Sequence, residues 1–150
     1  MKLTEHFYLE EFVVSQTATR AGIDNTPPPE VMENLRRLCE FVLEPLRLSY
    51  GPVLISSGYR CPTLNAAIGG AAKSQHTRGE AADISVRGRS LAEVYNFLRI
   101  NVPFDQLIRE FPPGGWIHVS YVEQGRGSTF LARLEGGKTV YEAWKGDVTV

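Results

Sequence analysis

Apolar residues recur along the chain with two different periods, and these periods predict where helices and strands lie. Residues 30–49 have apolar side chains at three- and four-residue spacing, which predicts one long helix after Pro27, Pro28 and Pro29. Pro45 lies inside this pattern and is expected to bend or shorten the last turn. Two runs, 53–57 and 82–86, are rich in β-branched and small apolar residues and are predicted to be strands.

Shorter patterns complete the set of predicted elements. We expect a helical turn at 9–14, a short helix at 63–68, and a helix at 91–100 that opens with a Ser90/Glu93 capping box. Residues 104–111 and 116–121 predict two strands joined by a Pro- and Gly-rich turn, and 129–134 with 139–144 predict a second hairpin at the sheet edge. Residues 15–26 are polar and predict a surface connection.

The chain of 150 residues shows no repeat or linker, so we expect a single domain. Its parts are an N-terminal arm at 1–26, a core at about 27–122 and a C-terminal hairpin at about 126–145. A net charge of −1 and scattered basic residues give no electrostatic basis for binding nucleic acid or a membrane surface. The first residues lack the apolar region of a signal peptide, so we expect synthesis in the cytoplasm.

A candidate metal site appears where a histidine and an aspartate lie seven positions apart among small residues. These are His76 and Asp83, and imidazole and carboxylate are ligands that zinc accepts. A catalytic zinc takes three protein ligands, and the chain has only two other histidines, His6 and His118. Strand alternation lets His118 face a cleft, whereas His6 lies in the N-terminal arm, where a surface or capping role is expected.

The spacing alone leaves two interpretations of these residues open. In the first, His76, Asp83 and His118 bind one zinc ion. In the second, His76 is a loop histidine, Asp83 caps a strand end and His118 is a hydrogen-bonded core group.

Several motifs in a fixed order resemble one known family. Residues 74–83 have the pattern Ser-x-His-x-x-Gly-x-Ala-x-Asp, and Trp-x-His-x-Ser follows at 116–120. Ser-Gly-Tyr-Arg at 57–60, Leu-Asn at 64–65, Gly-Gly at 69–70 and Phe-Asp-Gln-Leu-Ile at 104–108 also match. Together they resemble the zinc D-Ala-D-Ala carboxypeptidase/L-Ala-D-Glu endopeptidase family of peptidoglycan peptidases, most closely its compact phage endolysin-like branch. The resemblance extends over roughly residues 7–121.

The resemblance implies a small α+β fold in which a central antiparallel sheet carries the metal and helices pack against it, as in the hedgehog/DD-peptidase fold. It implies one catalytic Zn²⁺ bound by His76, Asp83 and His118, and hydrolysis of amide bonds in peptidoglycan stem peptides. We expect a monomer without nucleic-acid or membrane partners. It would act on the cell wall and, as phage lysis proteins do, reach the wall through a separate membrane pore.

Such an enzyme needs a general base, and Glu110 is the best candidate because it is the carboxylate that closely precedes His118 on the neighbouring predicted strand. Related enzymes have a glutamate three residues before the last histidine ligand, but here that position is Gly115. If residue 110 pairs near 116, Glu110 shares the face of His118, whereas pairing near 117 turns it away. Glu80 and Asp105 are weaker alternatives.

Three further residues are expected in the substrate site. Arg60 matches the family's Gly-Tyr-Arg arginine and could bind a substrate carboxylate or stabilise the developing oxyanion, although a structural salt bridge is the other interpretation. Ser74 and Gln75 flank His76 and could hydrogen-bond the substrate peptide.

Two other functions remain open for a chain of this kind. One is a non-catalytic cell-wall-binding or phage assembly domain on the same fold. The other is a signalling or scaffold module like the hedgehog relatives, which the brevity of the chain disfavours.

Overall fold

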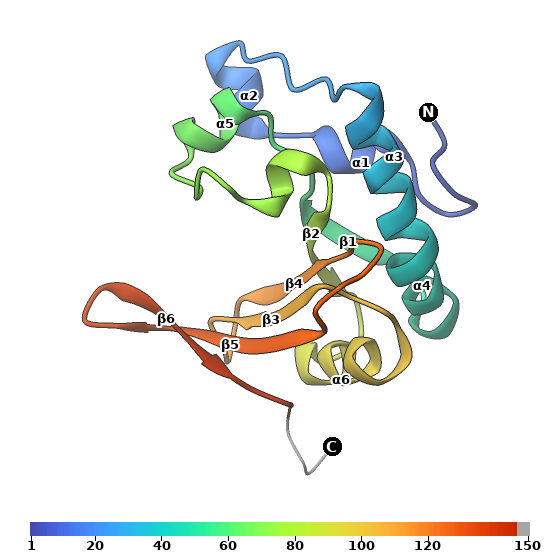
Figure 1. The fold of residues 1–150 in the computed structure, drawn as a ribbon, viewed down its shortest axis with the longest axis vertical. Helices are drawn as coiled ribbons and strands as arrows, with labels where there is room; N and C mark the ends of the chain where they lie inside the picture. Colours follow the sequence, from blue (N-terminus) through green and yellow to red (C-terminus); the bar gives the residue numbers. More distant parts are fainter. Residues whose placement is uncertain (147–150) are drawn as a thin grey trace.

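A six-stranded sheet organises the chain in the computed structural model, which describes residues 1–146. The strands lie in the order β1-β2-β4-β3-β5-β6 (Figure 1). Their bounds are β1 Val53–Ser57, β2 Ala81–Val86, β3 Gln106–Glu110, β4 Trp116–Ser120, β5 Ser128–Glu135 and β6 Lys138–Ala143. Neighbours are antiparallel except β3 and β5, which are parallel. The predicted α+β class is therefore confirmed, with one parallel pair in a sheet that was expected to be antiparallel.

The two faces of the sheet have different environments because successive side chains of a strand point to opposite sides. Ile84 of β2 and Ile117 of β4 are opposite each other and fully buried against the helices. Asp83 and His118, one position along, are opposite each other on the other face. The helix-covered face thus holds the core, and the second face is left for polar side chains.

The long helix predicted for 30–49 is present as three consecutive segments. These are α3 (Pro29–Leu38), a π-helical turn η1 (Cys39–Leu43) and α4 (Glu44–Tyr50). In the wider turn the backbone N–H of Glu44 donates to the carbonyl of Cys39. Pro45 has no N–H to donate, and a π turn is a common way for a helix to absorb such an interruption. The helix therefore continues past Pro45 through Tyr50, with Gly51 as its C-cap, and the interruption at Pro45 is marked by this π turn.

The N-terminal arm has more structure than its polar sequence predicted. The expected turn at 9–14 is present as α1 (Leu9–Val13), but 15–26, predicted to be a surface connection, contains α2 (Gln16–Ala21). Asn25 is buried, and its amide donates to the carbonyls of Val13 and Tyr59. The side-chain carbonyl of Asn25 accepts a hydrogen bond from the backbone N–H of Cys61. A single buried amide thus joins the arm to the loop that follows β1.

The remaining helices agree with the predictions. Helix α5 spans Pro62–Ala67, and α6 spans Leu91–Asn101 with both hydrogen bonds of the Ser90/Glu93 capping box present. Within residues 1–146 no helix has both the length and the apolar character needed to cross a lipid bilayer.

Gly58, directly after β1, marks a close approach between the arm and the sheet. A Cβ placed on Gly58 would lie 2.6 Å from the carbonyl oxygen of Phe12 and 2.7 Å from its Cα. Backbone atoms cannot move aside as the end of a flexible side chain can, so only glycine fits here.

We predict that Gly58→Ala lowers the free energy of unfolding by about 1–3 kcal/mol, the usual cost of overpacking. Gly114→Ala is the matched control because a Cβ there meets no atom within 4 Å. Urea unfolding monitored by circular dichroism measures both variants. Equal midpoints for Gly58→Ala and the parent protein would contradict the close approach.

Candidate metal centre

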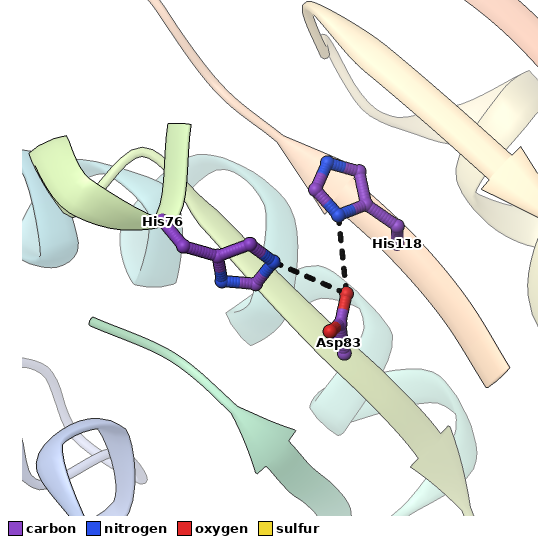
Figure 2. A group of neighbouring side chains, drawn as sticks. All are labelled: His76, Asp83 and His118. Atoms are coloured by element: carbon purple, nitrogen blue, oxygen red, sulfur yellow. Dashed lines mark hydrogen bonds and ion pairs between the residues drawn. The ribbon is translucent and has the colours of Figure 1, made fainter. Parts of the chain in front are cut away.

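The antiparallel register of β2 and β4 places Asp83 directly opposite His118. The Nδ1 atom of His118 lies 3.1 Å from Asp83 Oδ1. Both side chains are largely buried, with 12% and 13% of their surfaces exposed. Figure 2 shows the imidazole of His118 and that of His76 converging on the same carboxylate oxygen.

His76 reaches this point from a short 3₁₀ helix, η2 (Gln75–Arg78), which precedes β2. The hydroxyl of Ser74 accepts a hydrogen bond from the His76 backbone N–H and so caps the turn. Gly79 ends the turn in a left-handed conformation, with φ at +71°, and packs closely against Val31 of α3. The turn is therefore held at both ends, and His76 is 3% exposed.

The hydrogen bonding of His76 determines which ring nitrogen is free. Its Nδ1 lies 2.7 Å from the carbonyl oxygen of Gly58. A carbonyl only accepts, so Nδ1 carries the proton and Nε2 keeps its lone pair. Nε2 lies 3.4 Å from Asp83 Oδ1. A backbone carbonyl that orients one nitrogen while the other faces a carboxylate is the usual arrangement of a metal-binding histidine.

The three side chains fit a tetrahedral metal ion. Each offers one ligand atom, and these atoms lie within 4.8 Å of one another. Zinc–ligand bonds of about 2.0–2.1 Å at tetrahedral angles separate ligand atoms by about 3.3 Å. The separations of 3.1 and 3.4 Å from Asp83 Oδ1 to His118 and His76 are close to this value. His6, the remaining histidine, lies elsewhere, with its Nδ1 2.7 Å from Glu44 Oε1.

The charge state of Asp83 suits a ligand. Burial by itself would raise the pKa of Asp83, but the adjacent rings of His118 and His76 outweigh it and hold this pKa well below its usual range. The carboxylate is therefore ionised at neutral pH. Acting as ligands in their neutral forms, the two imidazoles together with this carboxylate would leave a bound divalent cation with a net positive charge.

Glu110 lies on the same face of the sheet as this cluster. In the β3–β4 pair, Glu110 is opposite Trp116 and Ile108 is opposite His118. This is the register that puts Glu110 on the side of His118. Glu110 is 8% exposed, and burial raises the pKa of its carboxyl. A partly desolvated carboxylate with a raised pKa is suited to accept and return a proton.

The two alternative carboxylates are held by cations. The carboxylate of Asp105 accepts from Nε and Nη2 of Arg126 at 2.9 and 2.8 Å, and from Gln75 at 3.0 Å. The hydrogen bonds from Arg126 lower the pKa of Asp105 to about 2. Glu80 pairs with Arg78 at 3.0 Å. Glu110, by contrast, has no ion pair with Lys or Arg among residues 1–146.

Arg60 is positioned beside the cluster by its backbone, whose N–H donates to the carbonyl of His76. Its Nη2 makes one long hydrogen bond, 3.4 Å, to the hydroxyl of Ser74. Its buried Nε has no partner, and burial lowers the pKa of the guanidinium. Arg60 forms no salt bridge within the described part of the chain, so the structural interpretation of this arginine has no support.

All of these side chains line one open cleft of about 920 Å³. Its lining includes cationic and aromatic side chains from several segments of the chain. The cationic residues are Arg60, Lys73, Arg78 and Arg126, and the aromatic ones are Phe111, Trp116, Phe130 and Tyr141.

Three residues that line this cleft were not predicted from the sequence: Arg126, Phe130 and Tyr141. Arg126 stands between two glycines in a loop, and a single exposed arginine gives no signal until its partner Asp105 is known. The two aromatic residues belong to an ordinary alternating hairpin pattern, and their face is decided by strand pairing.

A His-Asp-His cluster with a nearby desolvated carboxylate, on the open face of the sheet in a cleft, is the arrangement of a metal-dependent hydrolase. The family model described as Peptidase M15 matches residues 5–120. The chain belongs to this family of zinc peptidases of the D-Ala-D-Ala carboxypeptidase type, which confirms the resemblance seen in the motifs. No curated protein matches the chain.

We predict that His76→Ala abolishes stoichiometric metal binding and lowers the metal affinity by more than about 100-fold. Loss of a residue that only hydrogen-bonds to a ligand already lowers metal affinity by about 10–100-fold, and loss of a ligand should cost more. His6→Ala is the matched control, since His6 contacts Glu44 instead. Elemental analysis after dialysis against zinc measures the metal content, and circular dichroism verifies the fold. Full zinc content in folded His76→Ala would overturn the assigned ligand.

A second prediction concerns acid stability and Asp105. Its folded pKa of about 2 is below the ordinary 3.8, so Asp105 stabilises the fold fully above pH 4, and this contribution is lost as the pH falls towards 2. Asp105→Asn should lower the free energy of unfolding by about 1–2 kcal/mol at pH 7. This is less than the full pKa shift would give, because the exposed Arg126 is screened by solvent. The difference from the parent protein should shrink between pH 4 and 2 in urea titrations. A difference that does not change with pH would contradict this assignment.

Proposed function

We propose that this protein is a zinc-dependent peptidase that hydrolyses amide bonds in peptidoglycan stem peptides, either as a D-Ala-D-Ala carboxypeptidase or as an L-Ala-D-Glu type endopeptidase of the endolysin kind. The observation that carries the proposal is the placement of Glu110 and the His-Asp-His cluster on one face of the sheet in an open cleft. Membership of Peptidase M15 supports the peptidase activity. The stem-peptide substrate rests on the resemblance of the motifs.

The proposed ligands are His76 through Nε2, Asp83 through its carboxylate and His118 through Nδ1. A bound Zn²⁺ would polarise the scissile carbonyl and make a water molecule acidic enough to react near neutral pH. Gly58 keeps the imidazole of His76 in the tautomer that leaves Nε2 available.

Glu110 is proposed as the general base. Its carboxylate would take the proton of the attacking water and then pass it to the leaving amine. The raised pKa brings the carboxyl closer to the working pH, which favours both transfers. Asp105 is less suited because Arg126 stabilises its ionised form, and Glu80 is less suited because it forms an ion pair with Arg78.

Arg60 is proposed to bind a substrate carboxylate or the oxyanion of the tetrahedral intermediate. The partly desolvated guanidinium of Arg60 forms no ion pair among residues 1–146, so it gains from an anionic ligand. Ser74 and Gln75 line the same cleft and are proposed as substrate contacts. The hydroxyl of Ser74 also accepts a hydrogen bond from Arg60 and so orients it, and the side-chain amide of Gln75 donates a hydrogen bond to Asp105.

The enzyme would act as a monomer on the cell wall. A non-catalytic wall-binding or phage assembly domain would need no base beside the metal, so the position of Glu110 favours catalysis. Mass spectrometry of muropeptides after digestion, with and without a chelator, tests the function and identifies the bond. Release of peptide or D-alanine only by the zinc-loaded protein is the expected result.

We predict that Glu110→Gln retains zinc but lowers the rate of muropeptide cleavage by about 10²–10⁴-fold, the usual contribution of a general base. Glu5→Gln, an exposed carboxylate in the arm, is the matched control and should cleave at the parent rate. Zinc content and initial rates measured on the same samples separate metal loss from loss of the base. An undiminished rate in Glu110→Gln would mean that another group accepts the proton.

A further inference from the structure

The cleft continues beyond Glu110 onto the C-terminal hairpin of β5 and β6. Phe130 of β5 and Tyr141 of β6 line the same cavity as His118 and Glu110. Both aromatic residues lie outside residues 5–120, the part of the chain that the family model matches. The hairpin therefore adds to this cleft a wall that the family match does not include. In Figure 1, β5 lies beside β3, with β6 as the outermost strand.

Strand register places Tyr141 on the face of the catalytic groups. Glu110 is opposite Ala132 in the parallel β3–β5 pair, and Ala132 is opposite Tyr141 in the antiparallel β5–β6 pair. Residues opposite each other in neighbouring strands share a face. The row Trp116, Glu110, Ala132 and Tyr141 therefore crosses four strands on one side of the sheet.

The residue between Glu110 and Tyr141 is small. Ala132 has only a methyl side chain and is fully buried, so neighbouring side chains close over it and the cleft is lined by Glu110 and Tyr141 themselves. Burial, and to a lesser extent the charge of Glu110, raises the pKa of Tyr141, which agrees with the two groups facing the same space. A second row, with His118, Ile108 and Phe130, runs parallel to the first.

Tyr141 is available for binding. It is 56% exposed, and no group among residues 1–146 forms a hydrogen bond with its hydroxyl. Phenols of this kind combine apolar contact area with a polar end at a small cost in conformational entropy.

We propose that Phe130 and Tyr141 form a substrate subsite that binds an extended peptide segment on the side of Glu110 away from the metal ligands, with the Tyr141 hydroxyl hydrogen-bonded to the peptide main chain. The inference rests on the proposed peptidase function. Two strand intervals of about 4.8 Å separate β3 from β6, and an extended peptide advances about 3.3 Å per residue. The subsite therefore takes about three residues on one side of the scissile bond.

Peptides of increasing length test the subsite. Starting from the bond that muropeptide digestion identifies, synthetic peptides are lengthened one residue at a time toward either end. In one of the two series, kcat/KM of the zinc-loaded protein should rise by about tenfold when the peptide becomes long enough to reach the hairpin, and the rise should come from a lower KM. A tenfold gain is what one hydrogen bond with some apolar burial is expected to contribute. Tyr141→Ala should remove that rise, and Tyr141→Phe should remove only the part due to the hydroxyl.

Val140→Ala is the matched control, because it lies on the same strand with its side chain on the opposite face. Calorimetry with the Glu110→Gln protein measures binding of the uncleaved long and short peptides without turnover. Adding Tyr141→Ala should weaken the long peptide by about tenfold and leave the short one unchanged.

Each outcome supports or overturns the subsite. Two results would overturn the subsite and leave the peptidase function intact. One is a kcat/KM of the active parent protein that does not depend on peptide length. The other is a loss of kcat/KM in Tyr141→Ala that is equal for short and long peptides. Failure of the zinc-loaded protein to cleave any peptide would overturn the proposed function instead. The calorimetric comparison then still decides whether the hairpin binds the peptide.

Discussion

The pairing of β2 with β4 is the constraint on which the site depends. A slip of one residue in either strand would turn its polar side chain, Asp83 or His118, into the helix-covered core and expose its isoleucine, Ile84 or Ile117, to the cleft. Burying an unpaired carboxylate costs several kcal/mol, and exposing one isoleucine costs about 1.5–3 kcal/mol, so the register is strongly determined. The hydrophobic core under the helices thus positions the polar cluster on the opposite face of the sheet.

Three carboxylates in one cleft have different properties because their surroundings differ. Asp83 is kept ionised by two imidazoles, which outweigh its burial, and Asp105 by Arg126. Glu110 is buried and forms no ion pair with Lys or Arg within residues 1–146, and burial raises its pKa. The three carboxylates therefore suit different roles: a candidate ligand, a structural anchor and a candidate base. Arg60, which forms no ion pair in the described part of the chain, adds a positive charge beside them.

The prediction from sequence succeeded where the pattern is local and failed where distant residues decide. The capping box of α6 and the strands around 53–57 and 82–86 follow from neighbouring residues, and they are present. The polar residues at 15–26 predicted a surface connection, but this part of the arm contains α2. Asn25 is buried there because its amide satisfies carbonyls of Val13 and Tyr59, one of them 34 positions away. Pro45 was expected to bend or shorten the last turn of the helix, and the structure has a π turn directly before it that lets the helix continue to Tyr50.

The sequence by itself determined the chemical types and order of the candidate ligands, the α+β class and the family, because these depend on residue identity and spacing. Only the tertiary structure decided which side chains share a face. Glu110 faces the cleft because it pairs with Trp116 and not with Ile117. Tyr141 faces the cleft because β5 pairs with β3 and β6 pairs with β5 in the registers observed. Register is set by packing across the whole sheet, and a one-residue change reverses every side chain. For that reason the His76–Asp83–His118 cluster was visible in the sequence, whereas the hairpin wall of its cleft was not.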